Sequence, residues 1–277
     1  MKPTQNNRRA AVVSDKTGVE LRPRDNKQDL ATAAAREFIN TVAELQRTGD
    51  TVTGDGIVRV VLTGGGAGIA TLAEIAALDH AAQQTAEDFP VTAIDWSQVY
   101  VFFGDERFLA AGDAERNDKQ AFDALLRHVN IPSLNVFRVP ALAAGEEPDG
   151  PALDAAAELY GKTVDQVAPE GFDIHLLGMG PEGHINSLFP HTDALLQAEG
   201  SVVAVRECPK PPAERISLTM QAVNRSRQVW LLVSGEEKKE AAGQVFNGGN
   251  GAEWPAALAS GTKATLLWVD EAANPLL

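Results

Sequence analysis

His184 stands in the segment of this chain that is best suited to chemistry, Phe172-Asp-Ile-His-Leu-Leu-Gly-Met-Gly-Pro-Glu-Gly-His-Ile-Asn-Ser-Leu-Phe-Pro190. An apolar run leads there into three closely spaced glycines, which let a backbone turn sharply and approach a ligand closely. Histidine moves protons readily near neutral pH. The carboxylate of Glu182 is close enough to orient or tune the imidazole, so we expect His184 and Glu182 to be catalytic. The remaining histidines lack such a loop and are expected on the surface or in packing: His80, His128, His175 and His191.

A second glycine loop, Leu62-Thr-Gly-Gly-Gly-Ala-Gly68, lies between an apolar strand-like run and a helix-like segment. Backbone N–H groups in such a loop and at the following helix N-terminus can bind a phosphate. The loop lacks the Gly-Lys-Ser/Thr ending of a P-loop, and Ile69 replaces the third glycine of a dinucleotide fingerprint. A plain tight turn is the alternative to a phosphate loop.

A third loop, Phe103-Gly-Asp-Glu-Arg-Phe108, places three charges after an apolar strand and is followed by Asn117. Arg107 can offer planar, bidentate donors to a phosphate or carboxylate. The alternative is a salt-bridged surface loop. Two cationic residues later in the chain could likewise either bind an anion or lie on the surface. Arg215 opens a strand, and Lys238 stands in the first turn of a helix, where a positive charge opposes the helix dipole unless it reaches an anion.

Strand and helix patterns alternate over most of the chain, which predicts an α/β fold with a mainly parallel sheet and helices on both faces. The predicted strands are 57–63, 99–103, 174–177, 202–205, 215–218, 229–233 and 265–269. The predicted helices are 29–46, 69–78, 117–129, 153–167 and 236–246. All three glycine-containing loops follow strands, so they should open on one edge of the sheet, where such folds bind ligands.

The composition fits one α/β domain over residues 1–277, with residues 1–25 as a flexible N-terminal extension. The net charge of −14 favours solubility and argues against nucleic-acid binding. An anionic ligand would therefore need a local basic pocket.

The single cysteine, Cys208, excludes an intrachain disulfide and has neither a glycine elbow nor an obvious base beside it. The polar N-terminus has no signal-peptide core, and no window approaches the length of a membrane span. We therefore expect a cytoplasmic protein that does not bind membranes.

In ordered blocks from about residue 60 to residue 240, the chain resembles the 6-phosphogluconolactonase family. The blocks are Leu62-Thr-Gly-Gly-Gly66, Phe103-Gly-Asp-Glu-Arg107 with Asn117, the Phe172–Pro190 segment, Arg215-Ile-Ser-Leu-Thr219 and Gly235-Glu-Glu-Lys238. The resemblance implies a fold similar to glucosamine-6-phosphate deaminase and ribose-5-phosphate isomerase. It implies hydrolysis of 6-phospho-D-glucono-1,5-lactone in the oxidative pentose phosphate pathway, without metal or organic cofactor. His184 matches the family's catalytic histidine. Matching substrate-binding positions are Gly64, Gly65, Gly66, Asp105, Arg107, Asn117, Gly180, Arg215 and Lys238.

The chain departs from the family pattern at Ala67, where a hydroxyl is common, so Thr63 or Thr71 would have to supply one. Glu182 stands where aspartate is frequent. The partner expected is a small phosphosugar lactone, and the expected assembly is a monomer or small homo-oligomer. The alternatives are a glucosamine-6-phosphate deaminase or sugar-phosphate isomerase, and a sugar-phosphate sensor without turnover.

Overall fold

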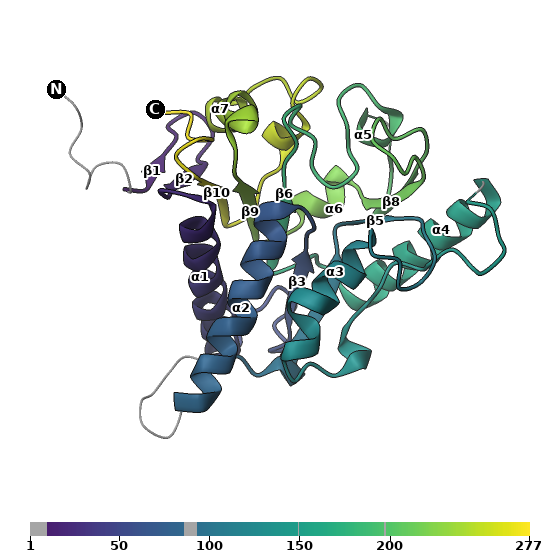
Figure 1. Cartoon of the computed structure of the whole chain (residues 1–277), viewed down its shortest axis with the longest axis horizontal. Helices are drawn as coiled ribbons and strands as arrows, with labels where there is room; N and C mark the ends of the chain where they lie inside the picture. The colour runs from purple at the N-terminus through teal and green to yellow at the C-terminus, as the bar shows by residue number, and fades with distance from the viewer. Residues whose placement is uncertain (1–9, 86–92, 149, 197) are drawn as a thin grey trace.

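The computed structural model describes residues 10–85, 93–148, 150–196 and 198–277 (Figure 1). Its strands are β1 Val12–Val13, β2 Glu20–Pro23, β3 Val58–Leu62, β4 Val99–Phe103, β5 Asp105–Arg107, β6 Ile174–Gly178, β7 Val202–Val205, β8 Arg215–Leu218, β9 Gln228–Val233 and β10 Ala264–Val269. Its α-helices are α1 Lys27–Thr48, α2 Gly66–Thr85, α3 Asn117–Ala124, α4 Gly150–Val167, α5 Asp193–Leu196, α6 Met220–Asn224 and α7 Lys239–Asn247. Short 3₁₀ turns are η2 Trp96–Gln98, η3 Leu126–His128, η4 Ser133–Asn135, η5 Glu236–Lys238 and η6 Pro255–Leu258.

The main sheet has the strand order β1-β2-β10-β9-β6-β3-β4. Every neighbouring pair is parallel except β1 and β2, which pair antiparallel at one edge. The mainly parallel sheet predicted from the sequence is therefore confirmed. Because β4, β3, β6 and β9 are consecutive neighbours, the loops that follow them leave from adjacent points on one sheet edge.

Helices cover both faces of this sheet, and the strands alternate accordingly. In β9, Trp230 and Leu232 belong to a core that also contains most buried residues of α1, whereas Val229, Leu231 and Val233 belong to a second core with α7. Side chains of successive strand residues point to opposite faces, so a strand that is apolar throughout indicates a sheet covered on both sides. In Figure 1, α1 and α2 run side by side across one face.

A second sheet, of order β5-β8-β7 and antiparallel throughout, was not predicted as a separate layer. Gly104 lies at the junction of the two sheets. Its N–H donates to the Leu62 carbonyl in β3 at 3.2 Å, and its carbonyl accepts from the Leu218 N–H of β8 at 2.8 Å. The chain therefore passes from one sheet into the other within a single residue.

The expectation of a flexible extension over residues 1–25 is wrong for its second part. β2 pairs in parallel with β10, with Leu21 opposite Leu267, and Leu21 is fully buried. The short apolar alternation of Glu20-Leu-Arg-Pro23 gave too weak a signal to predict a strand whose partner lies near residue 267. Residues 1–9 lie outside the described residues.

Two predicted helices differ from the observed ones. The helix expected over 117–129 ends at Ala124 and continues as the 3₁₀ turn η3. The helix expected over 236–246 begins with the 3₁₀ turn η5, and α7 starts at Lys239. Element boundaries of this kind depend on capping contacts that periodicity does not record.

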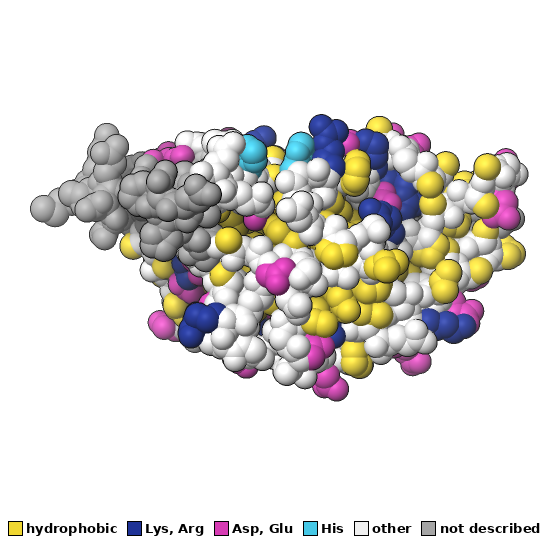
Figure 2. Space-filling model, turned by 90° about the horizontal axis from the view of Figure 1, so that it is seen from below, with side chains coloured by type: hydrophobic (Ala, Val, Ile, Leu, Met, Phe, Trp, Pro, Cys, Tyr) yellow, Lys and Arg dark blue, Asp and Glu magenta, His cyan; other side chains and the backbone are white. Residues whose placement is uncertain are grey.

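The surface seen in Figure 2 mixes basic, acidic and apolar side chains, with the lysines and arginines in separate small groups. Within the described ranges, no helix is both long enough and apolar enough to cross a membrane.

Tyr160 of α4 completes the hydrogen bonding at the open edge of β4. Its hydroxyl donates to the Phe103 carbonyl and accepts from the Phe103 N–H, both at 2.9 Å, and it is fully buried. Burial raises the pKa of this hydroxyl, so it stays protonated. The hydroxyl thus fixes the last residue of β4, immediately before the Gly-Asp-Glu-Arg loop.

We predict that Tyr160→Phe lowers the free energy of unfolding by about 1–3 kcal/mol, because two buried backbone groups lose their partner while the ring packing is kept. Urea denaturation would measure the change. Tyr100→Phe is the matched control, since no hydrogen bond of the Tyr100 hydroxyl is found within the described residues; equal losses in the two variants would contradict the prediction.

Candidate active site

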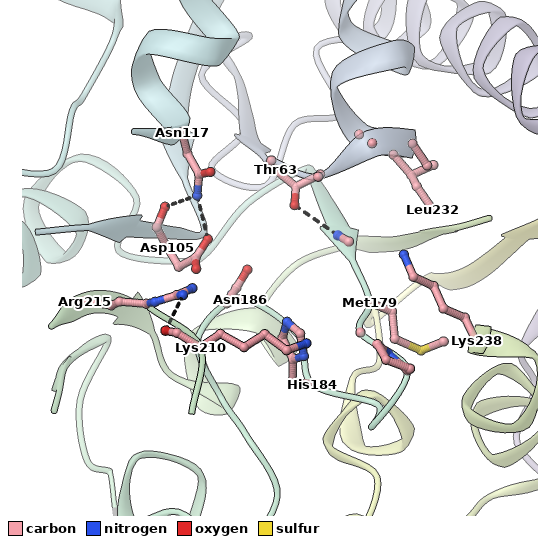
Figure 3. A pocket seen from close by; sticks show the side chains of 18 of the residues that line it. Thr63, Asp105, Asn117, Met179, His184, Asn186, Lys210, Arg215, Leu232 and Lys238 are labelled. Atoms are coloured by element: carbon pink, nitrogen blue, oxygen red, sulfur yellow. Dashed lines mark hydrogen bonds between the residues drawn. The ribbon is translucent and has the colours of Figure 1, made fainter. Parts of the chain in front are cut away.

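A cavity of about 280 Å³ opens where the main sheet's strands end (Figure 3). All three glycine-containing loops contribute to it, as the sequence predicted. Its lining is Thr63, Gly64, Gly65, Gly66, Ala67, Gly68, Asp105, Arg107, Asn117, Gly178, Met179, Gly180, Pro181, His184, Asn186, Lys210, Arg215, Leu232 and Lys238. Every predicted site residue lines the cavity except Glu182, which contacts His184.

The loop after β6 closes on itself and presents the imidazole of His184. The Gly180 N–H donates to the His184 carbonyl at 3.0 Å, and the Gly183 N–H donates to the Gly180 carbonyl at 3.0 Å. A Cβ atom on Gly180 would lie 2.1 Å from His184 Nδ1, so only glycine leaves room for the ring. The ring's other neighbour is Phe189, stacked at 4.1 Å between centroids with an interplanar angle of 15°.

The carboxylate of Glu182 lies beside the imidazole. Its Oε1 is 3.2 Å from His184 Nδ1, without the alignment of a hydrogen bond, and 2.8 Å from Lys210 Nζ. Burial first, and Lys210 second, lower the pKa of His184 to about 4, against the opposing effects of Glu182 and Asp105. Burial raises the pKa of Glu182, but the hydrogen bond and the charge of Lys210 lower it. The pKa of Glu182 is lowered overall. At neutral pH the site therefore holds a neutral imidazole beside an ionised carboxylate.

Asp105 ties the loop that follows β4 to the start of α3 and to the loop that follows β6. Its Oδ1 accepts from Asn117 Nδ2 at 2.8 Å, and its Oδ2 accepts from Ser187 Oγ at 2.7 Å. Ser187 is fully buried and lies three residues after His184. In the Ser187-Leu-Phe-Pro190 segment, Ser187 thus fixes Asp105 and Phe189 packs on the imidazole.

Glu106, which the sequence analysis did not single out, organises the start of α3 from a fully buried position. Its Oε1 accepts from the N–H groups of Asn117 at 2.6 Å and Arg107 at 2.9 Å, and its Oε2 accepts from the Asp118 N–H at 2.9 Å. Arg116 lies 3.6 Å away. A carboxylate that accepts the free N–H groups of a helix start is favourably placed relative to the helix dipole. It fixes the backbone on which Arg107 and Asn117 stand.

The two arginines of the site lie directly opposite each other, because Arg107 of β5 pairs with Arg215 of β8. Like charges in that position repel each other. Arg107 Nη1 donates to the Glu115 carbonyl and, at 3.4 Å, to Asn117 Oδ1, while its buried Nε finds no partner in the part of the chain that the structure describes. Among the described residues, neither arginine forms an ion pair with a carboxylate, so both positive charges remain available to an anion.

Arg215 also holds another cation in place. Its Nε donates to the Pro212 carbonyl at 3.1 Å and its Nη2 to the Lys210 carbonyl at 2.9 Å. Lys238 approaches from the opposite wall (Figure 3). Burial is the main cause that lowers the pKa of Lys238, and the charge of Lys210 adds to it. The cavity thus supplies the local basic environment that a chain of net charge −14 requires for an anionic ligand.

The three glycines after β3 have different roles. A Cβ on Gly64 would lie 2.3 Å from Asn117 Oδ1, and Gly65 has φ +78°, which favours glycine. Gly66 starts α2, and a Cβ there would meet open space. Gly66, Ala67 and Gly68 line the cavity, so the first turn of α2, whose N–H groups have no partner within the helix, borders it. The expected hydroxyl is Thr63, because Thr71 is fully buried and donates to the Ala67 carbonyl.

Lys210 and Asn186 also line the cavity, although the sequence did not predict them as site residues. Lys210 lies in Glu207-Cys-Pro-Lys-Pro-Pro212, and the only available signal was its position shortly before Arg215. Asn186 follows His184 by two residues but gave no pattern of its own. Within the described ranges, no group of three or more His, Cys, Asp and Glu side chains could hold a metal ion.

The family described as glucosamine-6-phosphate isomerases/6-phosphogluconolactonase matches residues 25–268. The chain belongs to this family. A 6-phosphogluconolactonase of Mycobacterium tuberculosis is 45% identical over 246 residues, which are 87% of this chain and 91% of the relative. A 6-phosphogluconolactonase of Streptomyces coelicolor is 39% identical over 255 residues, which are 90% of each chain. The resemblance inferred from the motifs is confirmed.

Solved structures show that the fold is that of the glucosamine-6-phosphate isomerase/6-phosphogluconolactonase family. The 6-phosphogluconolactonase of Trypanosoma brucei superposes with a TM-score of 0.74 at 22% identity, covering 94% of this chain and 98% of that one. A monomeric glucosamine-6-phosphate deaminase superposes with a TM-score of 0.68 at 22% identity, covering 91% and 98%. Because both activities occur on this fold, the fold does not distinguish them.

We predict that His184 titrates with a pKa of about 4 in the folded protein. Histidine-labelled protein, with His184→Asn to assign the resonance, would show this in an NMR pH titration. Lys210→Met should raise this pKa by removing a nearby positive charge, and Glu182→Gln should lower it further. A titration near the ordinary value of about 6.5 would contradict the burial of the ring.

Proposed function

We propose that the chain hydrolyses 6-phospho-D-glucono-1,5-lactone to 6-phospho-D-gluconate, with His184 as the general base. The observation that carries this proposal is the placement of the His184 imidazole beside Glu182 in a cavity with four cationic side chains, in a chain 45% identical to a 6-phosphogluconolactonase. A neutral imidazole accepts a proton from water, and the cations match a phosphorylated substrate.

The proton transfers follow from the placement of the imidazole. The Glu182 carboxylate beside Nδ1 favours the proton on that nitrogen, so Nε2 is the free base. Nε2 takes a proton from water as the water oxygen bonds to C1 of the lactone. The bond between C1 and the ring oxygen then breaks, and the imidazolium returns the proton to that oxygen. The new carboxylic acid ionises, which leaves 6-phosphogluconate.

The remaining polar groups hold the substrate during these steps. The N–H groups at the start of α2 and the cationic side chains bind the phosphate, and this remote binding aligns C1 with His184. Arg107 or loop N–H groups stabilise the oxyanion that forms at C1. The lactone is already reactive, so alignment and one base are sufficient catalysis.

A glucosamine-6-phosphate deaminase, an isomerase and a sensor without turnover are the competing functions. One assay separates them: the lactone is generated in situ, the protein is added, and lactone loss is followed beyond the spontaneous rate. No acceleration would reject the lactonase, and ammonia release from glucosamine 6-phosphate would favour the deaminase. The cytoplasmic location and the monomeric or small homo-oligomeric state remain predictions.

We predict that His184→Asn lowers kcat by about 10²–10⁴-fold, the usual contribution of a general base. The rate is measured in the same assay after subtraction of spontaneous hydrolysis. His191→Asn is the control, because His191 is exposed and pairs with Glu253. Turnover of His184→Asn close to that of the unmodified protein would remove His184 as the base.

We predict that Lys238→Met raises KM for the lactone by about tenfold or more with a smaller change in kcat, because a charge that faces the phosphate is lost. Lys239→Met is the matched control: the neighbouring lysine is outside the cavity lining and donates to the Leu277 carbonyl. An equal KM in both variants would show that Lys238 does not bind the phosphate.

A further inference from the structure

Asn186 is the cavity residue with the least explained side chain. Both polar atoms of its amide, Oδ1 and Nδ2, are buried and have no hydrogen-bond partner within the described residues. Its backbone is left-handed, with φ 48°. Asparagine adopts this conformation more readily than most non-glycine residues, so the unusual feature is the amide. Buried amides are normally hydrogen-bonded, and an unpartnered one reduces stability unless a ligand or water satisfies it.

The neighbouring chain fixes the position of this amide. A Cβ atom on Gly104 would lie 2.3 Å from Asn186 Oδ1, so the amide occupies the space that any other residue at 104 would fill. Gly104 cannot move aside easily, because its N–H and carbonyl bond to both sheets. Ser187, the next residue, is buried and bonded to Asp105. The backbone on both sides of the amide is therefore fixed, although the amide itself has no hydrogen-bond partner within the described residues.

Figure 3 shows the Asn186 side chain between Asp105 and His184, directed into the cavity. The amide thus lies on the His184 side of the site. It is neutral and offers two donor hydrogens and one acceptor oxygen. The dianionic phosphate of a sugar phosphate has acceptor oxygens only and would leave the amide oxygen unpaired. A carbonyl with an adjacent hydroxyl can satisfy both ends of the amide.

We propose that the Asn186 amide binds the lactone end of the substrate, with Nδ2 donating to the C1 carbonyl oxygen and Oδ1 accepting from the C2 hydroxyl. This inference rests on the proposed function and adds a residue that selects 2-hydroxylated lactones. As water attacks C1, charge develops on the carbonyl oxygen, so the Nδ2 hydrogen bond strengthens in the transition state.

The variant that tests this is Asn186→Gly, because glycine adopts a left-handed backbone without strain while removing the amide. The substrates are 6-phospho-D-glucono-1,5-lactone and its 2-deoxy analogue, each corrected for spontaneous hydrolysis. The unmodified protein should prefer the 2-hydroxyl substrate by about fivefold in kcat/KM, the effect of one neutral hydrogen bond. Asn186→Gly should lower kcat/KM for that substrate by about tenfold or more and abolish the preference. An unchanged preference in the variant overturns the proposal.

Two further measurements separate substrate contact from a structural role. By calorimetry, Asn186→Gly should bind inorganic phosphate as the unmodified protein does but bind 6-phospho-D-gluconate several-fold more weakly; equal weakening of both overturns the proposal. His191→Gly is the matched control, since His191 is also left-handed, at φ 59°, but exposed and outside the lining, and it should leave both preference and affinity unchanged.

The hydrolysis assay distinguishes failure of the lactonase proposal from failure of the Asn186 proposal. If the unmodified protein accelerates hydrolysis of neither lactone, the lactonase assignment fails and the role of Asn186 falls with it. If it hydrolyses the lactones and only the preference survives in Asn186→Gly, the lactonase stands and only the role of Asn186 is overturned.

Discussion

The parallel pairing of β4, β3, β6 and β9 is the constraint on which the site depends. Parallel strands end on the same side, so residues from positions 63, 105, 184 and 238 reach one cavity although they lie far apart in sequence. Each strand is buried on both faces and cannot shift its register without exposing apolar side chains. The packing of the core therefore fixes the positions of the loop residues that form the site. The small antiparallel sheet adds the second wall, which carries Arg215.

At three places in the site, a glycine backbone lies very close to a polar side chain. Gly64, Gly104 and Gly180 each lie against a polar side chain, namely Asn117, Asn186 and His184. None of these glycines has a positive φ, so the reason for glycine at these positions is the neighbouring side chain rather than the backbone conformation. The glycine loops were expected to approach a ligand, and in part they instead make room for the groups that face it. Gly65 alone in the triple glycine has the conformation that favours glycine.

Sequence periodicity predicted the strands that form the centre of the sheet, because long apolar runs between glycines have few other interpretations. The glycine-loop motifs and the family resemblance, not periodicity, singled out His184, Arg107 and Asn117, and all three line the cavity. Periodicity missed β2, whose two inward-facing side chains give almost no periodic signal and whose partner is β10 at the other end of the chain. It missed Lys210 and Asn186 for a similar reason: their importance arises only from the tertiary placement of β8 and of Gly104. In the sequence, Glu106 is one of three adjacent charged residues, and nothing distinguishes it from the other two. Only its hydrogen bonds to the first N–H groups of α3 show its structural role.

The opposition of Arg107 and Arg215 has a consequence for the stability of the molecule. Two guanidinium groups that lie opposite each other, with no carboxylate partner among the described residues, raise the free energy of the fold, and an anion bound between them would lower it. Binding of phosphorylated compounds is thus linked to resistance against heat and denaturant. A phosphorylated ligand bound between the two arginines would therefore also slow proteolysis, because proteases act on the unfolded population.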